Sequence, residues 1–175
     1  MRVFFALEPD AATRRAIVDW RDRYGLAAGR PVAAANFHVT LAFIGDVSTR
    51  QLDTLCSAVD DRQTGSDFAA GELHLDQVGF WPGPAIYWMG TSQPPPQLHD
   101  LARKLQHVGG LVGGRLEHKA FTPHITLYRN CGEPPPAPVV LPAINLSYRH
   151  FTLFESVPGR QGVNYRTMAQ WELTR

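Results

Sequence analysis

The sequence predicts an α+β fold, in which strands and helices follow one another without a regular alternation. Apolar residues recur at strand spacing in some segments and at helix spacing in others. The irregular order of these segments disfavours the repeated βαβ units of a doubly wound parallel sheet. A short pattern, His-x-Thr-Leu, also occurs in two distant apolar runs, at residues 38–41 and 124–127.

Each expected element has its own local signal. Short apolar or alternating runs predict strands, and apolar residues spaced by three and four predict helices. Asp10 and Ser48 suit the starts of two helices, and a run of prolines precedes a third. The expected order is a strand at 2–7, a helix at 10–24, a loop, a strand at 37–44, a helix at 48–61, strands at 71–80 and 85–90, a helix at 94–108, and strands at 123–128, 144–156 and 165–173.

The chain length and the spacing of the motifs indicate the domain organisation. A chain of 175 residues can bury one sizeable core. The two motifs lie about half the chain apart, so we expect a single domain, residues 1–175, made of two lobes. No apolar run reaches the roughly 18 residues of a membrane span, and the first residues do not read as a signal peptide. The expected location is therefore the cytoplasm, without membrane association.

Charge and cysteine content argue against several classes of function. The net charge is +1, so no broad basic surface for long duplex nucleic acid is expected. The basic residues are fifteen arginines and two lysines. Arginine suits phosphate contacts, but general composition bias explains the excess equally. Cys56 and Cys131 are not in a Cys-x-x-Cys pair, which argues against a disulfide or a cysteine-based zinc site.

The paired motifs predict acid–base chemistry on a phosphate. On a strand, residues i and i+2 share a face, so His38 lies beside Thr40 and His124 beside Thr126. An imidazole exchanges a proton near neutral pH, and a hydroxyl donates to an anionic oxygen. If the two pairs face each other across a cleft, one histidine serves as base and the other as acid. The two threonines then hold the non-bridging oxygens, and the reaction needs no metal and no covalent intermediate.

Two alternative roles for the motifs stay open. A single His-x-Thr on a strand is usually structural, with the histidine satisfied by a backbone carbonyl. A zinc site is the second alternative, because histidine is a common zinc ligand and loop residues could complete the shell. A third copy, which begins at His150, shows how readily the four-residue pattern arises.

The sequence resembles the two-histidine (2H) phosphoesterase superfamily, whose signature is a pair of His-x-Thr/Ser motifs. Within it, the chain is similar to the bacterial RNA 2′,3′-cyclic phosphodiesterases, long labelled 2′-5′ RNA ligases. The likeness extends over nearly the whole chain and includes "RVFFAL", "GRPVAAANFHVTLAFIGDV", "FTPHITLYR", "FTLFES" and "YRTMAQWEL". It implies a bilobal fold, with two pseudo-symmetric sheet-plus-helix lobes around a central cleft.

The resemblance implies hydrolysis of RNA 2′,3′-cyclic phosphate ends to 2′-phosphomonoesters, with no metal or other cofactor. It leaves open a reversible 2′-5′ RNA ligation by the same groups. It makes His38 and His124 catalytic, with His124 favoured as the base that activates water, and Thr40 and Thr126 phosphate-binding. The implied partner is an RNA terminus or oligonucleotide that bears a 2′,3′-cyclic phosphate. The implied state is a monomer without an obligate protein partner.

The resemblance also implies roles for two residues beyond the motifs. Arg129 occupies the place of an arginine that helps to hold the ligand, and Phe43 that of an aromatic that touches a base. Regular strand parity would turn both side chains away from their histidines, so a bulge or a strand end would have to redirect them. Core packing is an equal alternative for Phe43. We expect His150 to be structural or exposed, because its flanking residues lack the likeness.

Two alternative functions stay open. One is a phosphodiesterase for small cyclic nucleotides, such as cyclic phosphates derived from ADP-ribose. The second is a noncatalytic module that binds RNA ends or nucleotides. Turnover of a short RNA compared with that of a mononucleotide separates the first from an RNA-end enzyme, and tight binding without turnover would identify the second.

Overall fold

A computed structural model of the chain describes residues 1–64, 68–114, 120–160 and 162–174. These residues form three α-helices and one 3-10 helix: α1 (Ala11–Tyr24), α2 (Thr49–Thr64), α3 (Pro96–Gly110) and η1 (Ala34–Asn36). They also form the strands β1 (Arg2–Leu7), β2 (Arg30–Pro31), β3 (Val39–Asp46), β4 (Gly71–Leu75), β5 (Gln77–Trp81), β6 (Ile86–Gly90), β7 (His124–Arg129), β8 (Ile144–Tyr148), β9 (His150–Gly159) and β10 (Gly162–Glu172). The predicted α+β class is confirmed.

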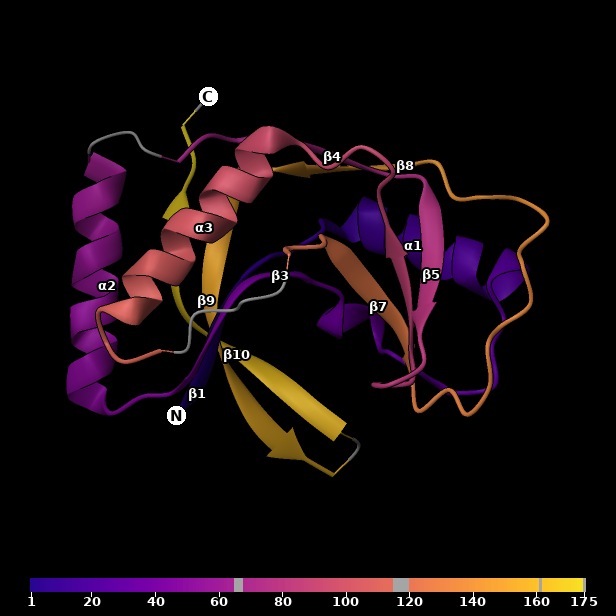
Figure 1. The fold of residues 1–175 in the computed structure, drawn as a ribbon, viewed down its shortest axis with the longest axis horizontal. Coiled ribbons are helices and arrows are strands. Elements are labelled where there is room, and N and C mark those ends of the chain that lie inside the picture. The colour runs from indigo at the N-terminus through magenta and orange to yellow at the C-terminus, as the bar shows by residue number, and fades with distance from the viewer. Residues whose placement is uncertain (65–67, 115–119, 161, 175) are drawn as a thin grey trace.

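The strands form two four-stranded sheets and one two-stranded sheet (Figure 1). The first sheet has the order β10-β9-β1-β3, the second β2-β7-β6-β5, and β4 pairs with β8. The named strands pair antiparallel throughout. We call the first sheet with α2 and α3 the first lobe, and the second sheet with α1 the second lobe.

Each sheet contacts a helix that follows a strand of the other sheet. The helix α1 follows β1 of the first sheet, yet its Arg21 side chain bonds to backbone carbonyls beside β2 and within β7 of the second. The helix α3 follows β6 of the second sheet, yet it packs against β3 of the first. Figure 1 shows α2 and α3 on one side of the molecule and α1 on the other. We propose that the two lobes fold as one domain, because each sheet contacts a helix that follows a strand of the other sheet.

The structure divides two of the expected strands and adds elements to one expected loop. The expected strand at 71–80 breaks at Asp76, whose carboxylate accepts hydrogen bonds from the backbone N–H and hydroxyl of Ser92. The expected strand at 144–156 divides at Arg149 into β8 and β9, which belong to different sheets. The loop expected after α1 contains β2 and η1. The spacing of apolar residues indicates which residues are buried but not the sheet to which a strand belongs. A strand that breaks or passes from one sheet to another therefore cannot be recognised from that spacing.

The helices α1 and α2 begin where the sequence predicted, and α3 begins at Pro96 instead of residue 94. The Asp10 side chain accepts from the Thr13 N–H at 2.8 Å, which is an N-cap contact. Ser48 and Gln51 form a capping box at the start of α2, with contacts of 2.8 and 3.1 Å between side chain and backbone N–H. None of the helices in the described ranges is long and apolar enough to cross a membrane.

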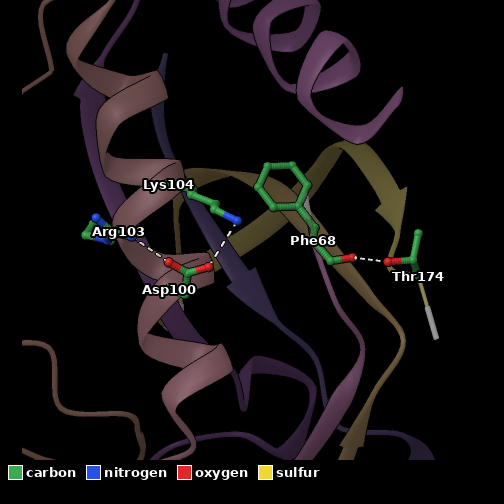
Figure 2. Close-up of polar contacts among 5 residues, drawn as sticks. All are labelled: Phe68, Asp100, Arg103, Lys104 and Thr174. Carbon is green, nitrogen blue, oxygen red and sulfur yellow. Dashed lines mark hydrogen bonds and ion pairs between the residues drawn. The ribbon is translucent and has the colours of Figure 1, made fainter. Parts of the chain in front are cut away.

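The helix α3 is held by its apolar face rather than by its charges. On its outer side, Asp100 pairs with Arg103 at 2.6 Å and with Lys104 at 3.0 Å (Figure 2). Exposed pairs of this kind add little to stability. The opposite face buries Leu98, Leu101, Leu105 and Val108.

The end of the chain is fixed to the segment before β4. In Figure 2, the Thr174 hydroxyl donates to the Phe68 carbonyl, at 2.8 Å. The Phe68 carbonyl also accepts from the Thr174 N–H at 2.9 Å. These contacts hold the end of the chain against the segment that contains the buried Phe68.

Candidate active site

The strand β3 changes its side-chain parity at a bulge just after Thr40. Its register passes from Ala42 to Thr40 across two consecutive residues of β1, so Leu41 has no partner. Leu41 and Ala42 are both buried although they are consecutive, which a bulge allows and a regular half-buried strand does not. Phe43 therefore returns to the face of Thr40, and both side chains line one groove.

The strand β7 has the same irregularity at the same place in its motif. Its register passes from Tyr128 to Thr126 across consecutive residues of β6, so Leu127 is the unpaired residue. Leu127 and Tyr128 are both buried. Arg129 is exposed on the side of His124, and its charge acts on both motif histidines. A bulge thus redirects the side chain five positions after each motif histidine.

Both imidazoles are held in the same tautomer. Nδ1 of His38 lies 2.8 Å from the backbone carbonyl oxygen of Asn36, and Nδ1 of His124 lies 2.7 Å from that of Thr122. A carbonyl oxygen only accepts, so Nδ1 carries the proton in each neutral ring. Nε2 is therefore the atom that each ring presents for proton transfer.

One groove, of about 600 Å³, contains side chains from both motifs. Thr40 and His124 line it together with Phe43, Trp81 and Phe121, and we call it the aromatic groove. The Thr40 hydroxyl lies 2.9 Å from Nε2 of His38, to which it donates when that ring is neutral. The structure therefore brings Thr40 of the first motif and His124 of the second to one groove, whereas His38 and Thr126 are not among its described lining residues.

Thr126 completes the set of four motif side chains. It is half-buried on β7, two residues after His124, and faces Trp88 of β6 across the pair of strands. The second motif thus presents an imidazole and a hydroxyl on one face, as the first does.

Burial makes both histidines weak bases in the free protein. It lowers the pKa of His38 to about 4, and the positive charges of Arg129 and His124 lower it further. The hydrogen bond to the Asn36 carbonyl acts in the opposite direction and raises the pKa. Burial also lowers the pKa of His124, with the Thr122 carbonyl opposing and Arg129 assisting. The charge of one imidazole thus reaches the other. Both rings are neutral near pH 7, and a bound anion would raise both pKa values.

Aromatic rings that the sequence did not single out surround the two imidazoles. The Trp81 ring stands edge-on to His124, with 4.6 Å between centroids, and the Tyr165 ring stands edge-on to His38 at 4.9 Å. The Phe4 ring lies 5.1 Å from His38. These rings exclude water and so cause the desolvation. Of these rings, only Trp81 could have been noticed in the sequence, because it begins the Pro/Gly turn "WPGP". The other rings come from strands that are distant in the sequence and carry no such signal.

Two glycines make room for the indole that supports His124. A Cβ at Gly79 or at Gly90 would clash with the Trp88 ring. The Trp88 ring lies 6.2 Å from that of His124. The absence of side chains at these two positions of β5 and β6 thus leaves room for the Trp88 ring near His124.

A buried arginine holds the bulge of β7. Nη1 of Arg21 donates to the carbonyls of Val32, at 2.6 Å, and Leu127, at 3.2 Å. Its guanidinium lies 5.3 Å from the Phe37 ring centroid and 5.6 Å from that of Tyr128. The carbonyl of Leu127 also accepts from the Val32 N–H at 2.9 Å, so Arg21 adds a second hydrogen bond at the unpaired residue of the bulge. Nothing in the sequence pointed to this role, which depends on a contact between α1 and a distant strand.

The third copy of the motif lies outside this site. His150 begins β9 and pairs with Glu172 of β10, and its companion Thr152 is fully buried. Neither residue is among the described residues that line the aromatic groove. Within the same described part of the chain, no group of three or more His, Cys, Asp or Glu side chains is placed to hold a metal ion.

Known proteins resemble this chain over its whole length. Residues 7–87 match the family described as LigT like Phosphoesterase. The RNA 2′,3′-cyclic phosphodiesterase of Escherichia coli (strain K12) is 37% identical over 177 residues, which cover 99% of this chain and 97% of that protein. The crystal structure of E. coli LigT complexed with 3′-AMP has a TM-score of 0.86 and 35% identity, with 99% and 98% of the two chains covered. A protein of Thermus thermophilus, 23% identical, shares the fold with a TM-score of 0.80 over 99% of this chain and 98% of its own. With more than a third of its residues shared over the full length of such a relative, the chain belongs to the LigT-like phosphoesterase family.

Proposed function

We propose that this protein hydrolyses RNA 2′,3′-cyclic phosphate ends to 2′-phosphomonoesters by acid–base catalysis between His38 and His124. The observation that carries the proposal is the matched presentation of two imidazoles, each fixed by the carbonyl two residues before it. A binding module has no need for two proton-transfer groups with a common tautomer. The activity of the E. coli relative, named RNA 2′,3′-cyclic phosphodiesterase, supports the same reaction.

In the proposed reaction, His124 is the base and His38 the acid. Nε2 of His124 takes a proton from water as the water oxygen bonds to phosphorus. The bond from phosphorus to the 3′-oxygen breaks, and protonated His38 gives that oxygen its proton from Nε2. The 2′-phosphomonoester remains, and the two imidazoles then regain their protonation states through solvent. If an RNA 5′-hydroxyl replaces water as the nucleophile, the same steps yield a 2′-5′ linkage.

The remaining groups stabilise the charge on phosphorus. We assign Thr40 and Thr126 to its non-bridging oxygens, since a hydroxyl lies beside each imidazole. Arg129 supports them, because its charge already acts on both histidines. A guanidinium placed there favours an anionic ligand and disfavours further positive charge on the imidazoles. Anion binding and histidine protonation are therefore coupled.

Phe43 is the proposed base contact. Its side chain is 37% exposed, and it lines the aromatic groove instead of the core. The Arg2 guanidinium lies 5.0 Å from the centroid of its ring and so steadies it. A base that stacks on an aromatic ring gains about 1–3 kcal/mol.

We also propose that the enzyme acts as a monomer in the cytoplasm. All of the proposed catalytic and binding side chains come from one chain, so no partner has to complete the site. RNA ends are the substrate, and RNA processing takes place in that compartment. Light scattering of the purified protein tests the monomer directly.

The decisive experiment is turnover of a short RNA that ends in a 2′,3′-cyclic phosphate, with the position of the product phosphate determined. We expect a 2′-phosphate, and a loss in kcat of about 10²–10⁴ in His38→Ala and in His124→Ala. His150→Ala is the matched control, because it removes the histidine of the third motif copy and should keep full activity. Full activity in either of the first two variants would contradict the proposal.

Two further measurements separate the alternatives. EDTA should leave the rate unchanged, whereas strict metal dependence would revive a zinc site. A bell-shaped dependence of rate on pH is expected for an acid–base pair. Faster turnover of a mononucleotide cyclic phosphate than of RNA would point to small nucleotides as the substrates.

A further inference from the structure

A second groove, of about 730 Å³, lies beside His38. Two of its lining residues touch that imidazole: Asn36 through its carbonyl and Tyr165 through its ring. Arg129, whose charge reaches both histidines, also lines it. The catalytic side chains are thus flanked by the aromatic groove, which His124 lines, and by this second groove.

Arginines dominate the second groove, and we call it the arginine groove. Arg21, Arg30, Arg129 and Arg160 line it, and its other described lining residues include no Asp or Glu. Arg21 is buried and bonded to backbone carbonyls, whereas the other three are exposed and come from β2, β7 and the β9–β10 turn. In a chain whose net charge is only +1, this is a local concentration of positive charge.

Two of these arginines occupy paired positions on neighbouring strands. In the register of β2 with β7, Arg30 pairs with Arg129. An anion bound beside these positions would be attracted by both guanidinium groups.

The β9–β10 hairpin closes the groove on its other side. Nδ2 of Asn36 donates to the Val163 carbonyl at 2.9 Å, which fixes β10 beside η1. Gly162 has a positive φ of 112°, and a Cβ there would come within 2.9 Å of Nη2 of Arg30. The positive φ is what favours glycine at this position, which lies beside the Arg30 guanidinium. The walls of the groove are built by contacts between distant segments and are not a chance cluster of surface side chains.

A nucleotide whose cyclic phosphate is bound between the two histidines needs two separate binding places, one for its base and one for its 5′-phosphate. In a terminal nucleotide with a 2′,3′-cyclic phosphate, the base and the 5′-oxygen leave the ribose on either side of the ring oxygen, away from the cyclic phosphate. When that phosphate lies between the two histidines, the base and the 5′-phosphate must occupy different places. Aromatic rings suit a base, and a basic groove suits the backbone of a single strand.

We propose that the arginine groove binds the phosphate attached to the 5′-oxygen of the terminal nucleotide, while the aromatic groove takes its base. This inference rests on the proposed function, since it assumes that the cyclic phosphate lies at His38 and His124. Arg30 and Arg160 are then the groups that distinguish an RNA strand from a mononucleotide.

Binding of two product analogues tests the groove without relying on turnover. The probes are adenosine 2′-monophosphate and adenosine 2′,5′-bisphosphate, compared by titration calorimetry at low salt. We expect the bisphosphate to bind at least about tenfold more tightly, as charge-assisted hydrogen bonds to a phosphate provide. Arg30→Ala and Arg160→Ala should each reduce this ratio several-fold. The preference should also weaken as salt increases.

Arg50→Ala is the matched control, because it removes an exposed arginine from α2, which contributes no residue to either groove. It should keep the wild-type ratio. Arg160 lies in an exposed turn, so its variant decides the question even if Arg30→Ala does not fold. Equal affinities of the wild type for the two probes, or an unchanged ratio in Arg160→Ala, would overturn the inference. Turnover of a cyclic phosphate by the same preparation tests the proposed function separately. If the protein keeps its preference for the bisphosphate but does not hydrolyse the cyclic phosphate, only the proposed reaction is rejected.

Discussion

The lowered pKa of His38 should make the folded protein sensitive to mild acid by an amount that the structure defines. An unfolded imidazole takes up its proton near pH 6.5, whereas folded His38 does so only at about pH 4. Between these values the unfolded state binds a proton that the folded state does not, so acidification lowers the free energy of unfolding. The contribution is fully present above pH 6.5. A difference of about 2.5 pH units corresponds to about 3 kcal/mol in all, of which about 2 kcal/mol is lost by pH 5.

Urea unfolding at pH 8 and at pH 5 measures this loss. The wild type should lose about 2 kcal/mol more stability between the two conditions than His38→Gln does, because the variant has no imidazole to protonate at that position. His124 contributes its own loss to both proteins and so cancels. Phe43→Leu, which changes the same face of β3 and keeps both histidines, should retain the whole wild-type loss. An equal loss in wild type and His38→Gln would show that His38 is not desolvated as described.

Three other substitutions test how the site is held. Arg21→Met removes both hydrogen bonds from the guanidinium to the backbone beside the β7 bulge, so we expect a free energy of unfolding about 2 kcal/mol smaller and a lower kcat. Arg21→Lys should recover part of the stability and part of kcat. Chemical denaturation and steady-state kinetics measure these effects. Arg129→Gln should raise the pKa of His38, because a nearby cation no longer opposes protonation of the imidazole. NMR titration of the histidines measures this pKa, and an unchanged pKa would show that the charge of Arg129 does not act on the His38 ring. Gly79→Ala should displace the Trp88 ring and lower kcat with little change in fold, and circular dichroism with kinetics would expose a purely structural effect.

The sequence predicted the elements well where burial alone defines them. The strand at 2–7, the start of α1 at Asp10 and the buried leucines of α3 all follow from local periodicity and capping. The prediction was wrong where a strand changes sheets, as at Arg149, since both parts of that segment are equally apolar. It also missed β2, because two residues show no period.

The site was predictable in its motifs and not in its walls. Alternation along a strand is enough to join His38 with Thr40 and His124 with Thr126. The aromatic rings around them come from segments far apart in sequence, and a single sequence carries no information on such contacts. Strand parity raised the question of where Phe43 points, but only the register with β1 answers it.

The two bulges explain how near-identical motifs produce an asymmetric site. Each shifts the parity at the motif leucine, so the fifth residue after the histidine returns to the face of its motif threonine in both lobes. That residue is Phe43 in one lobe and Arg129 in the other, an aromatic surface against a positive charge. A nucleotide has one flat apolar part and one charged part, so under the proposed function we expect it to bind in only one of the two orientations that pseudo-symmetry would allow. Under the proposed reaction, that single orientation decides which imidazole meets the leaving 3′-oxygen, and two otherwise similar histidines acquire different roles.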